Sequence, residues 1–144
     1  MERRWRILVV DEDRHFQLAL ASALEDWATV RIADTLETAR RLIDAWEPHA
    51  VILDPVLRTG DGLDLLRLCA GKRNLSVFCS LPQRFLASLR LPAYGIRGIP
   101  RNSSVRAIVE QITGHLAQGT RETDDCPVER REPAGTLVSR PLQR

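Results

Sequence analysis

The chain has 144 residues, of which 44% are apolar, so it can form one globular domain with its own core. Its 21 basic and 19 acidic side chains leave a net charge of +2, which does not favour direct contact with nucleic acid or an anionic membrane. The apolar runs are too short to cross a bilayer, and the basic start lacks the long apolar centre of a secretory signal. We therefore expect a cytoplasmic protein without membrane contact.

Strand and helix patterns alternate along the chain. Five segments rich in branched apolar residues predict strands, and a segment with helical spacing follows each of them. The predicted strands are residues 5–10, 29–33, 49–53, 75–80 and 96–99. The predicted helices are residues 14–27, 35–46, 61–68, 83–90 and 105–116. Right-handed crossovers then give an α/β fold, a doubly wound five-stranded parallel sheet with helices on both faces.

Polar residues between these segments predict caps and one loop. Asp34 followed by Glu37 is typical of a capping box at the start of the second helix. Asn102, Ser103 and Ser104 supply capping oxygens for the last helix. Residues 55–60 are expected to form a loop.

The character of the sequence changes after the last predicted helix. Residues 119–144 contain three prolines, many charges and few large apolar groups. We expect a folded domain over residues 1–118 and a disordered C-terminal tail or linker over residues 119–144. Nothing in this tail is typical of a DNA-reading helix-turn-helix.

Acidic residues follow two of the predicted strands. Asp11 and Glu12 come directly after an apolar run, and Asp54 follows another. Ligands of open α/β sheets bind just outside the carboxyl ends of the strands, so these carboxylates are expected to meet in one crevice. Because crowded carboxylates repel one another, a hard divalent cation such as Mg²⁺ is the expected partner. Asp13 is better explained as a helix cap than as a ligand.

Cysteine and histidine give no competing metal site. Three cysteines without paired spacing indicate neither a disulfide framework nor zinc. Cys69 and Cys79 are expected to be small buried apolar residues, whereas Cys126 lies in the polar tail. The three histidines show no ligand spacing and are expected at the surface or at edges; they are His15, His49 and His115.

Over roughly residues 5 to 117 the chain resembles the receiver domains of two-component response regulators. The matching residues are Ile7-Leu8-Val9-Val10-Asp11-Glu12-Asp13, Val51-Ile52-Leu53-Asp54, Leu57 and Asp61-Gly62-Leu63. The interval between Asp11 and Asp54 also agrees with the pattern of that family. The resemblance implies a flavodoxin-like sheet with the strand order 2-1-3-4-5.

The resemblance also implies a function, which is that of a phosphorylated signalling switch rather than an enzyme. Asp54 resembles the phosphoacceptor, which takes a phosphoryl group from a sensor histidine kinase or phosphotransfer protein to give an aspartyl phosphate. Asp11, Glu12 and Asp54, with the backbone carbonyl of Val56, resemble the Mg²⁺ ligands. Ser80 resembles the hydroxyl residue that hydrogen-bonds the phosphoryl group. Output would pass through a downstream protein or a homodimer.

Several positions depart from the receiver pattern. The lysine usual at the end of the fifth strand is missing: its charge selects Arg101 as the substitute, whereas its spacing from Ser80 selects Asn102. Leu81 stands where a small residue is usual and could narrow the access to the phosphoacceptor. Tyr94 comes too early to match the aromatic residue of the fifth strand.

Two other functions compete with the phosphoacceptor. The departures also suit a degenerate receiver, which keeps the fold as a phosphorylation-independent module for binding proteins. A flavodoxin-like nucleotide or flavin binder is disfavoured, because Asp11-Glu12-Asp13 would repel phosphate at the loop where such a ligand binds.

Overall fold

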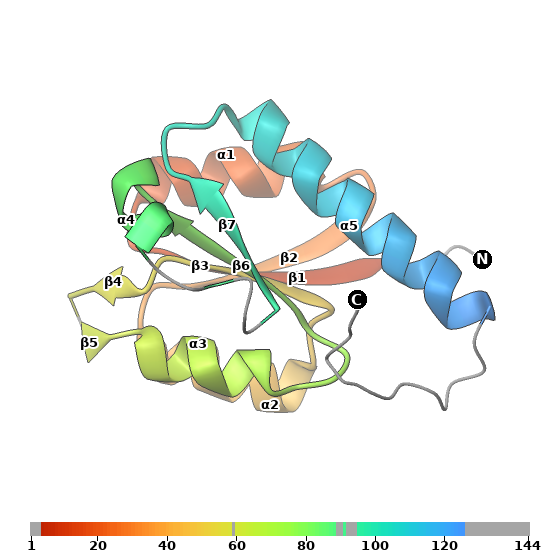
Figure 1. The fold of residues 1–144 in the computed structure, drawn as a ribbon, viewed down its shortest axis with the longest axis horizontal. Coiled ribbons are helices and arrows are strands. Elements are labelled where there is room, and N and C mark those ends of the chain that lie inside the picture. Colours follow the sequence, from red (N-terminus) through yellow and green to blue (C-terminus); the bar gives the residue numbers. More distant parts are fainter. Residues whose placement is uncertain (1–3, 59, 89–90, 92–94, 126–144) are drawn as a thin grey trace.

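The computed structural model describes residues 4–58, 60–88, 91 and 95–125 of the chain. Its centre is a sheet of five parallel strands (Figure 1). These strands are β1 (Trp5–Val10), β2 (Ala28–Ala33), β3 (Ala50–Leu53), β6 (Ser76–Leu81) and β7 (Ile96–Pro100). They lie in the order β2-β1-β3-β6-β7. Counted along the chain within this sheet, the order is second, first, third, fourth, fifth, which confirms the predicted fold class.

Helices cover both faces of the sheet. They are α1 (Arg14–Leu24), α2 (Leu36–Trp46), α3 (Leu63–Ala70), α4 (Gln83–Ser88) and α5 (Val105–Asp125). In Figure 1, α1 and α5 lie above the sheet while α2 and α3 lie below it. None of the helices in the described part of the chain is long and apolar enough to cross a membrane.

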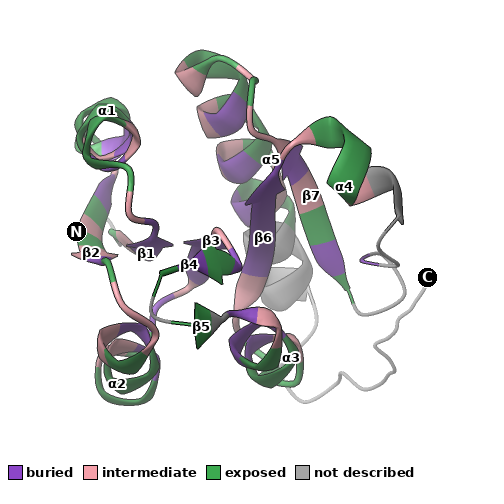
Figure 2. Ribbon diagram, turned by 90° about the vertical axis from the view of Figure 1, so that its left-hand side faces the viewer, coloured by how far each residue is buried: buried purple, intermediate pink, exposed green. Residues whose placement is uncertain are grey.

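The core consists of two apolar layers, one on each face of the sheet. Alternate residues of a strand point to opposite faces, so Ile7 and Val9 pack towards α1 and α5, whereas Leu8 and Val10 pack towards α2 and α3. The three central strands are buried on both faces, as Figure 2 shows for β6. This explains why their sequences are continuous apolar runs rather than alternating patterns.

The predicted boundaries differ from the structure at several elements, and three helices show this most clearly. The predicted first helix extended to residue 27, but α1 ends at Leu24. The last helix does not end near residue 116, because α5 continues to Asp125 and so occupies the first part of the predicted tail. The cap of α2 is Thr35 rather than Asp34, since the Thr35 hydroxyl accepts the Thr38 N–H.

The predicted loop after β3 is also more regular than expected. It contains a short antiparallel pair, β4 (Val56–Leu57) with β5 (Gly60–Asp61). Gly62 follows this hairpin, and its N–H donates to the Pro55 carbonyl at 2.7 Å. A Cβ atom at Gly62 would lie 2.8 Å from Pro55 Cα, so only glycine permits this close approach.

Some predictions fall outside the described residues. These are the position of Tyr94, the thiol of Cys126 and the tail from residue 126 onward. The burial of Cys69 and Cys79, in contrast, is confirmed, because both are fully buried. Burial also raises the pKa of the Cys69 thiol to about 11 and that of Cys79 to about 12.

Candidate functional site

The ends of β1 and β3 bring two carboxylates to the same edge of the sheet. Val10 and Leu53 are paired in the parallel register, so the residues that follow them, Asp11 and Asp54, lie level with each other. The Asp54 N–H donates to the Val10 carbonyl at 3.0 Å and extends this pairing. The predicted convergence of the two acids therefore follows from strand register.

Asp11 is held deep in this edge, with only 1% of its surface exposed. One of its carboxylate oxygens, Oδ1, accepts the Asp13 N–H at 2.8 Å. Its backbone carbonyl accepts a hydrogen bond from the buried Gln17 side chain. Asp13 itself is the N-cap of α1, as predicted, because its side chain accepts the N–H groups of His15 and Phe16.

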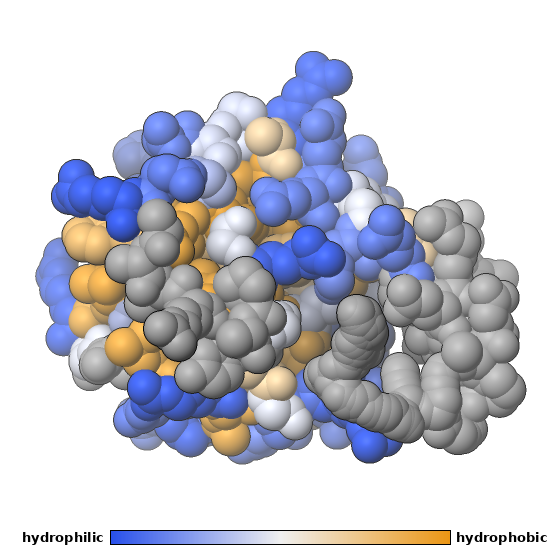
Figure 3. Space-filling model, viewed as in Figure 1, coloured by the Kyte–Doolittle hydropathy of each residue, from blue (hydrophilic) through white to orange (hydrophobic). Residues whose placement is uncertain are grey.

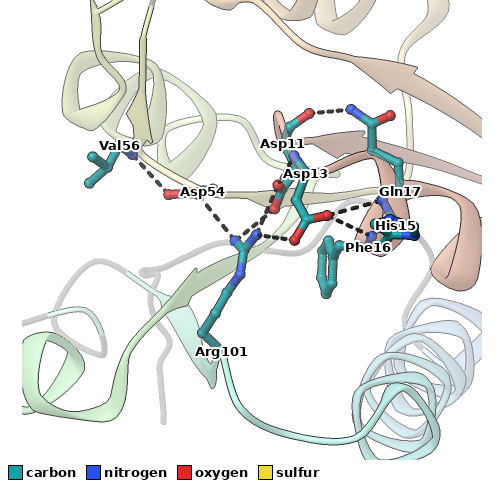
Figure 4. A network of polar contacts seen from close by, with 8 residues as sticks. All are labelled: Asp11, Asp13, His15, Phe16, Gln17, Asp54, Val56 and Arg101. Atoms are coloured by element: carbon teal, nitrogen blue, oxygen red, sulfur yellow. Dashed lines mark hydrogen bonds and ion pairs between the residues drawn. The ribbon is translucent and has the colours of Figure 1, made fainter.

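The side chain of Arg101, the residue that follows the edge strand β7, lies between these acids (Figure 4). The two Nη atoms of Arg101 bind both oxygens of Asp11, at 2.8 and 3.0 Å. Arg101 Nη1 also donates to Asp54 Oδ2 at 3.1 Å. Asp13 Oδ2 lies 3.8 Å from Nη2. One guanidinium group therefore contacts three carboxylates.

The backbone and an aromatic ring position this guanidinium group. The Arg101 N–H donates to the Leu81 carbonyl at 2.8 Å, which continues the β6–β7 pairing beyond the sheet. The guanidinium carbon lies 4.8 Å from the centre of the Phe16 ring on α1, within the range of a cation–π contact. Asn102, the alternative chosen by spacing, is exposed.

Asp54 remains partly accessible, with 18% of its side chain exposed. Its Oδ1 accepts the Val56 N–H at 2.9 Å, and its Oδ2 faces Arg101. Partial burial raises the pKa of the Asp54 carboxyl group. The Val56 N–H and the Arg101 charge act against this rise, whereas the neighbouring Asp11 and Glu12 add to it.

Glu12 makes its contacts with a different part of the edge. Its Oε2 accepts the Arg58 N–H at 2.6 Å, and its Oε1 lies 4.0 Å from Arg58 Nε. The side chain thereby ties the start of α1 to the turn of the β4–β5 hairpin. Glu12 is thus bound to the hairpin backbone rather than to the Arg101 guanidinium group that joins Asp11 and Asp54.

The expected Mg²⁺ ligands do not form a metal centre in this arrangement. Among the residues that the structure describes, no group of three or more His, Cys, Asp or Glu side chains could hold a metal ion. Asp11 and Asp54 do converge, but on Arg101, and Val56 contributes its N–H to Asp54. A guanidinium group thus stands where the shared cation was expected.

Ser80 lies on the strand next to the one that ends before Asp54. Leu53 pairs with Cys79, so Asp54 and Ser80 come next on adjacent strands, level with each other. Ser80 is fully buried, and its hydroxyl has no hydrogen-bond partner among the described residues. Leu81, expected to narrow the access, is buried in the apolar layer that faces α2 and α3.

Sequence reasoning missed three contributors to this site. Phe16 and Gln17 gave no signal beyond helical spacing, although one stacks on Arg101 and the other binds the Asp11 backbone. Arg58 lies in the predicted loop of residues 55–60, yet its N–H binds Glu12. Such contacts depend on how α1 and the hairpin pack at the sheet edge, which the linear pattern does not contain.

No protein-family model matches the sequence, and no curated protein matches it significantly. Solved structures do match. A CheY-like response regulator receiver domain protein from Methanospirillum hungatei aligns with a TM-score of 0.73 at 22% identity, covering 83% of this chain and 99% of the other. The signal receiver domain of a putative Luxo repressor protein from Vibrio parahaemolyticus also gives a TM-score of 0.73, at 19% identity, covering 90% and 100%.

A third match is the receiver domain of DrrB in its BeF3-activated form. It aligns with a TM-score of 0.68 at 18% identity, covering 80% of this chain and 99% of the other. All three are receiver domains, and each is matched over nearly its whole length. The chain therefore has the fold of a response regulator receiver domain.

Proposed function

We propose that this chain is the receiver module of a two-component signalling system and that Asp54 accepts a phosphoryl group. The donor would be a histidine of a sensor kinase or phosphotransfer protein, and the output would pass through contacts with a downstream protein or a second copy. The observation that carries the proposal is the position of Asp54. It follows a central strand, is partly exposed, binds the Arg101 guanidinium group, and lies level with Ser80, whose hydroxyl has no hydrogen-bond partner in the described part of the chain.

The chemistry required of the chain is modest. An Asp54 oxygen attacks phosphorus, the bond from phosphorus to the donor imidazole nitrogen breaks, and the released imidazole takes up a proton. Charge builds on the phosphoryl oxygens during this in-line transfer, and Arg101 is the cation placed to neutralise it. The buried Ser80 hydroxyl can donate a hydrogen bond to the bound phosphoryl group.

Arg101 fits this role by its charge and reach. Its planar fork can bind carboxylate and phosphoryl oxygens in pairs, which a lysine ammonium cannot do. Mg²⁺, which the resemblance implies, is left out of this mechanism because the expected ligands do not form a site for it among the described residues.

The test is phosphorylation of the purified chain by acetyl phosphate. We expect the wild type to gain the mass of one phosphoryl group, with the acid stability and alkaline lability of an acyl phosphate. Asp54→Asn should abolish the gain because the amide is not a nucleophile, while Asp64→Asn, an exposed acid on α3, serves as the matched control. Phosphorylation that persists in Asp54→Asn would refute the assignment.

One observation favours a second function, a phosphorylation-independent binding module. Both Asp54 oxygens already accept hydrogen bonds from the protein, and Arg101 is bound through two atoms to the buried Asp11. Amide NMR with a phosphate mimic separates the two functions. Shifts that reach β7 and α5 support the switch, whereas binding at Asp54 with no change there supports the module.

A further inference from the structure

Arg101 fills the space that a cation shared by two carboxylates would fill. Its two Nη atoms bind both oxygens of Asp11, and one of them also binds Asp54. The Asp11 side chain is 2% exposed, and the Arg101 side chain that binds it is 25% exposed. A buried carboxylate needs a compensating positive charge, and in this chain a side chain supplies it.

The acidic oxygens at this edge are already engaged with N–H groups. Oδ1 of Asp11 accepts the Asp13 N–H and Arg101 Nη2, and its Oδ2 accepts Arg101 Nη1. The two oxygens of Asp54 face the Val56 N–H and Arg101. A hexacoordinate cation needs oxygens that are free to turn towards it, and these oxygens are held by donors.

Two further contacts keep the guanidinium group in place. It stacks on the Phe16 ring, and its backbone N–H is fixed by the Leu81 carbonyl. Moving Arg101 out would break the cation–π contact and leave the buried Asp11 carboxylate without a compensating positive charge, with the Asp13 N–H as its remaining hydrogen-bond donor among the described residues. A divalent cation that enters between the acids must therefore overcome both losses, as well as charge repulsion from the guanidinium group.

We propose that Arg101 is a resident cation that replaces the divalent ion at this edge of the sheet and keeps its affinity for Mg²⁺ low. The inference concerns the same acids as the proposed phosphoacceptor site. Its functional consequence, charge compensation without a metal during phosphoryl transfer, rests on the proposed function. Removing the guanidinium group should uncover a divalent-cation site made by Asp11 and Asp54.

The experiment is a titration of the purified chain with Mg²⁺ by calorimetry and with Mn²⁺ by electron paramagnetic resonance, without any phosphodonor. Arg101→Gln removes the charge. We expect it to bind either ion at least roughly tenfold more tightly than the wild type. Arg106→Gln is the matched control, because Arg106 is an exposed arginine paired with Glu110 on α5, and its affinity should equal that of the wild type.

Two more variants keep the test decisive. In Arg101→Gln with Asp54→Asn the gained affinity should disappear, which places the new site between the two acids. If Arg101→Gln does not fold, Arg101→Lys is used instead, and its compact ammonium should give an intermediate gain. Tight binding by the wild type, an unchanged affinity after removal of the guanidinium group, or a gain that survives Asp54→Asn would each overturn the inference.

The result of the metal titration does not depend on whether the chain can be phosphorylated. A chain that accepts no phosphoryl group can still show the gain in metal affinity, which would refute the proposed function and support the resident cation. A chain that is phosphorylated on Asp54 and binds Mg²⁺ tightly with Arg101 present would give the opposite result.

Discussion

Residue type alone determines little of the geometry of this site, which contains Asp11, Asp54 and Arg101. Both acids could be placed from sequence, because each follows an apolar strand and strand register sets them side by side. The cation could not be placed in this way. Charge selected Arg101 and spacing selected Asn102, and only the course of the chain after β7 shows which side chain reaches the acids.

Ser80 offers a test at the same scale. Its hydroxyl is buried without a partner among the described residues, so it contributes a desolvation cost to the folded state. We expect Ser80→Ala to raise the free energy of unfolding by up to about 1 kcal/mol. The measurement is urea denaturation followed by circular dichroism.

A second serine is the control for this prediction. The Ser104 hydroxyl accepts the Ala107 N–H at 3.1 Å near the start of α5. Ser104→Ala should therefore lower the free energy of unfolding by about 1 kcal/mol. Equal losses in the two variants would show that the Ser80 hydroxyl has a stabilising partner in solution.

At the scale of elements, the hairpin before α3 depends on one glycine. The Gly62 N–H meets the Pro55 carbonyl, and an added Cβ would contact the Pro55 backbone at 2.8 Å. Since backbone cannot move aside cheaply, Gly62→Ala should lower the free energy of unfolding by about 1–3 kcal/mol. Thermal and urea unfolding of the variant measure this loss.

The matched control lies on α5. Nothing is within 4 Å of a Cβ added at Gly114, which lies on the exposed side of this helix. Alanine is a better helix former, so Gly114→Ala should raise stability by about 1 kcal/mol. If Gly62→Ala were as well tolerated as Gly114→Ala, the close approach to Pro55 would not constrain the hairpin.

The same elements show where sequence patterns stop being informative. The main strands were predictable because buried parallel strands are continuous apolar runs. The β4–β5 pair was missed because two residues in each strand are too few to show a period. The extension of α5 to Asp125 was missed because the apolar three-four spacing ends near Leu116.

At the scale of the whole molecule, some apolar side chains lie on the surface rather than in the core. Apolar side chains gather at the left-hand edge in Figure 3, where Figure 1 places α4 and the β4–β5 hairpin. Val56 is 72% exposed and Phe85 on α4 is 46% exposed. Val56 is two residues after Asp54 and donates its N–H to this carboxylate, so an exposed apolar side chain lies next to the site.

Packing of α5 on the sheet makes the stability of the whole molecule dependent on pH. His115 was expected at the surface or at an edge, and it is partly buried. Its ring lies edge-on to the buried Phe78, 5.6 Å between ring centres, and its Nδ1 accepts a hydrogen bond from Arg97. Burial, with a contribution from Arg97, lowers the pKa of His115 from 6.5 to about 4. The neutral ring is therefore the form that fits the folded state.

The unfolded chain binds a proton at His115 before the folded chain does. The contribution of the neutral His115 to the free energy of unfolding should therefore be fully present above pH 6.5 and be lost as the pH drops towards 4. We expect a loss of about 1–3 kcal/mol, reduced by the partial exposure of the ring. Urea denaturation across this interval measures it, and His115→Gln should flatten the curve while His15→Gln should not. Parallel curves for the wild type and His115→Gln would contradict this origin.

The bond between Arg101 and Asp11 joins residues 90 positions apart, nearly the full span of the sheet. Because a ribosome releases the chain from its N-terminus, both acids emerge long before the arginine that neutralises them. A nascent chain that has completed β3 thus carries bare carboxylates at an edge which, in the finished domain, holds its own counterion. The charge of the site formed by these early segments therefore changes only when the residues after β7 have been made and Arg101 binds the two acids.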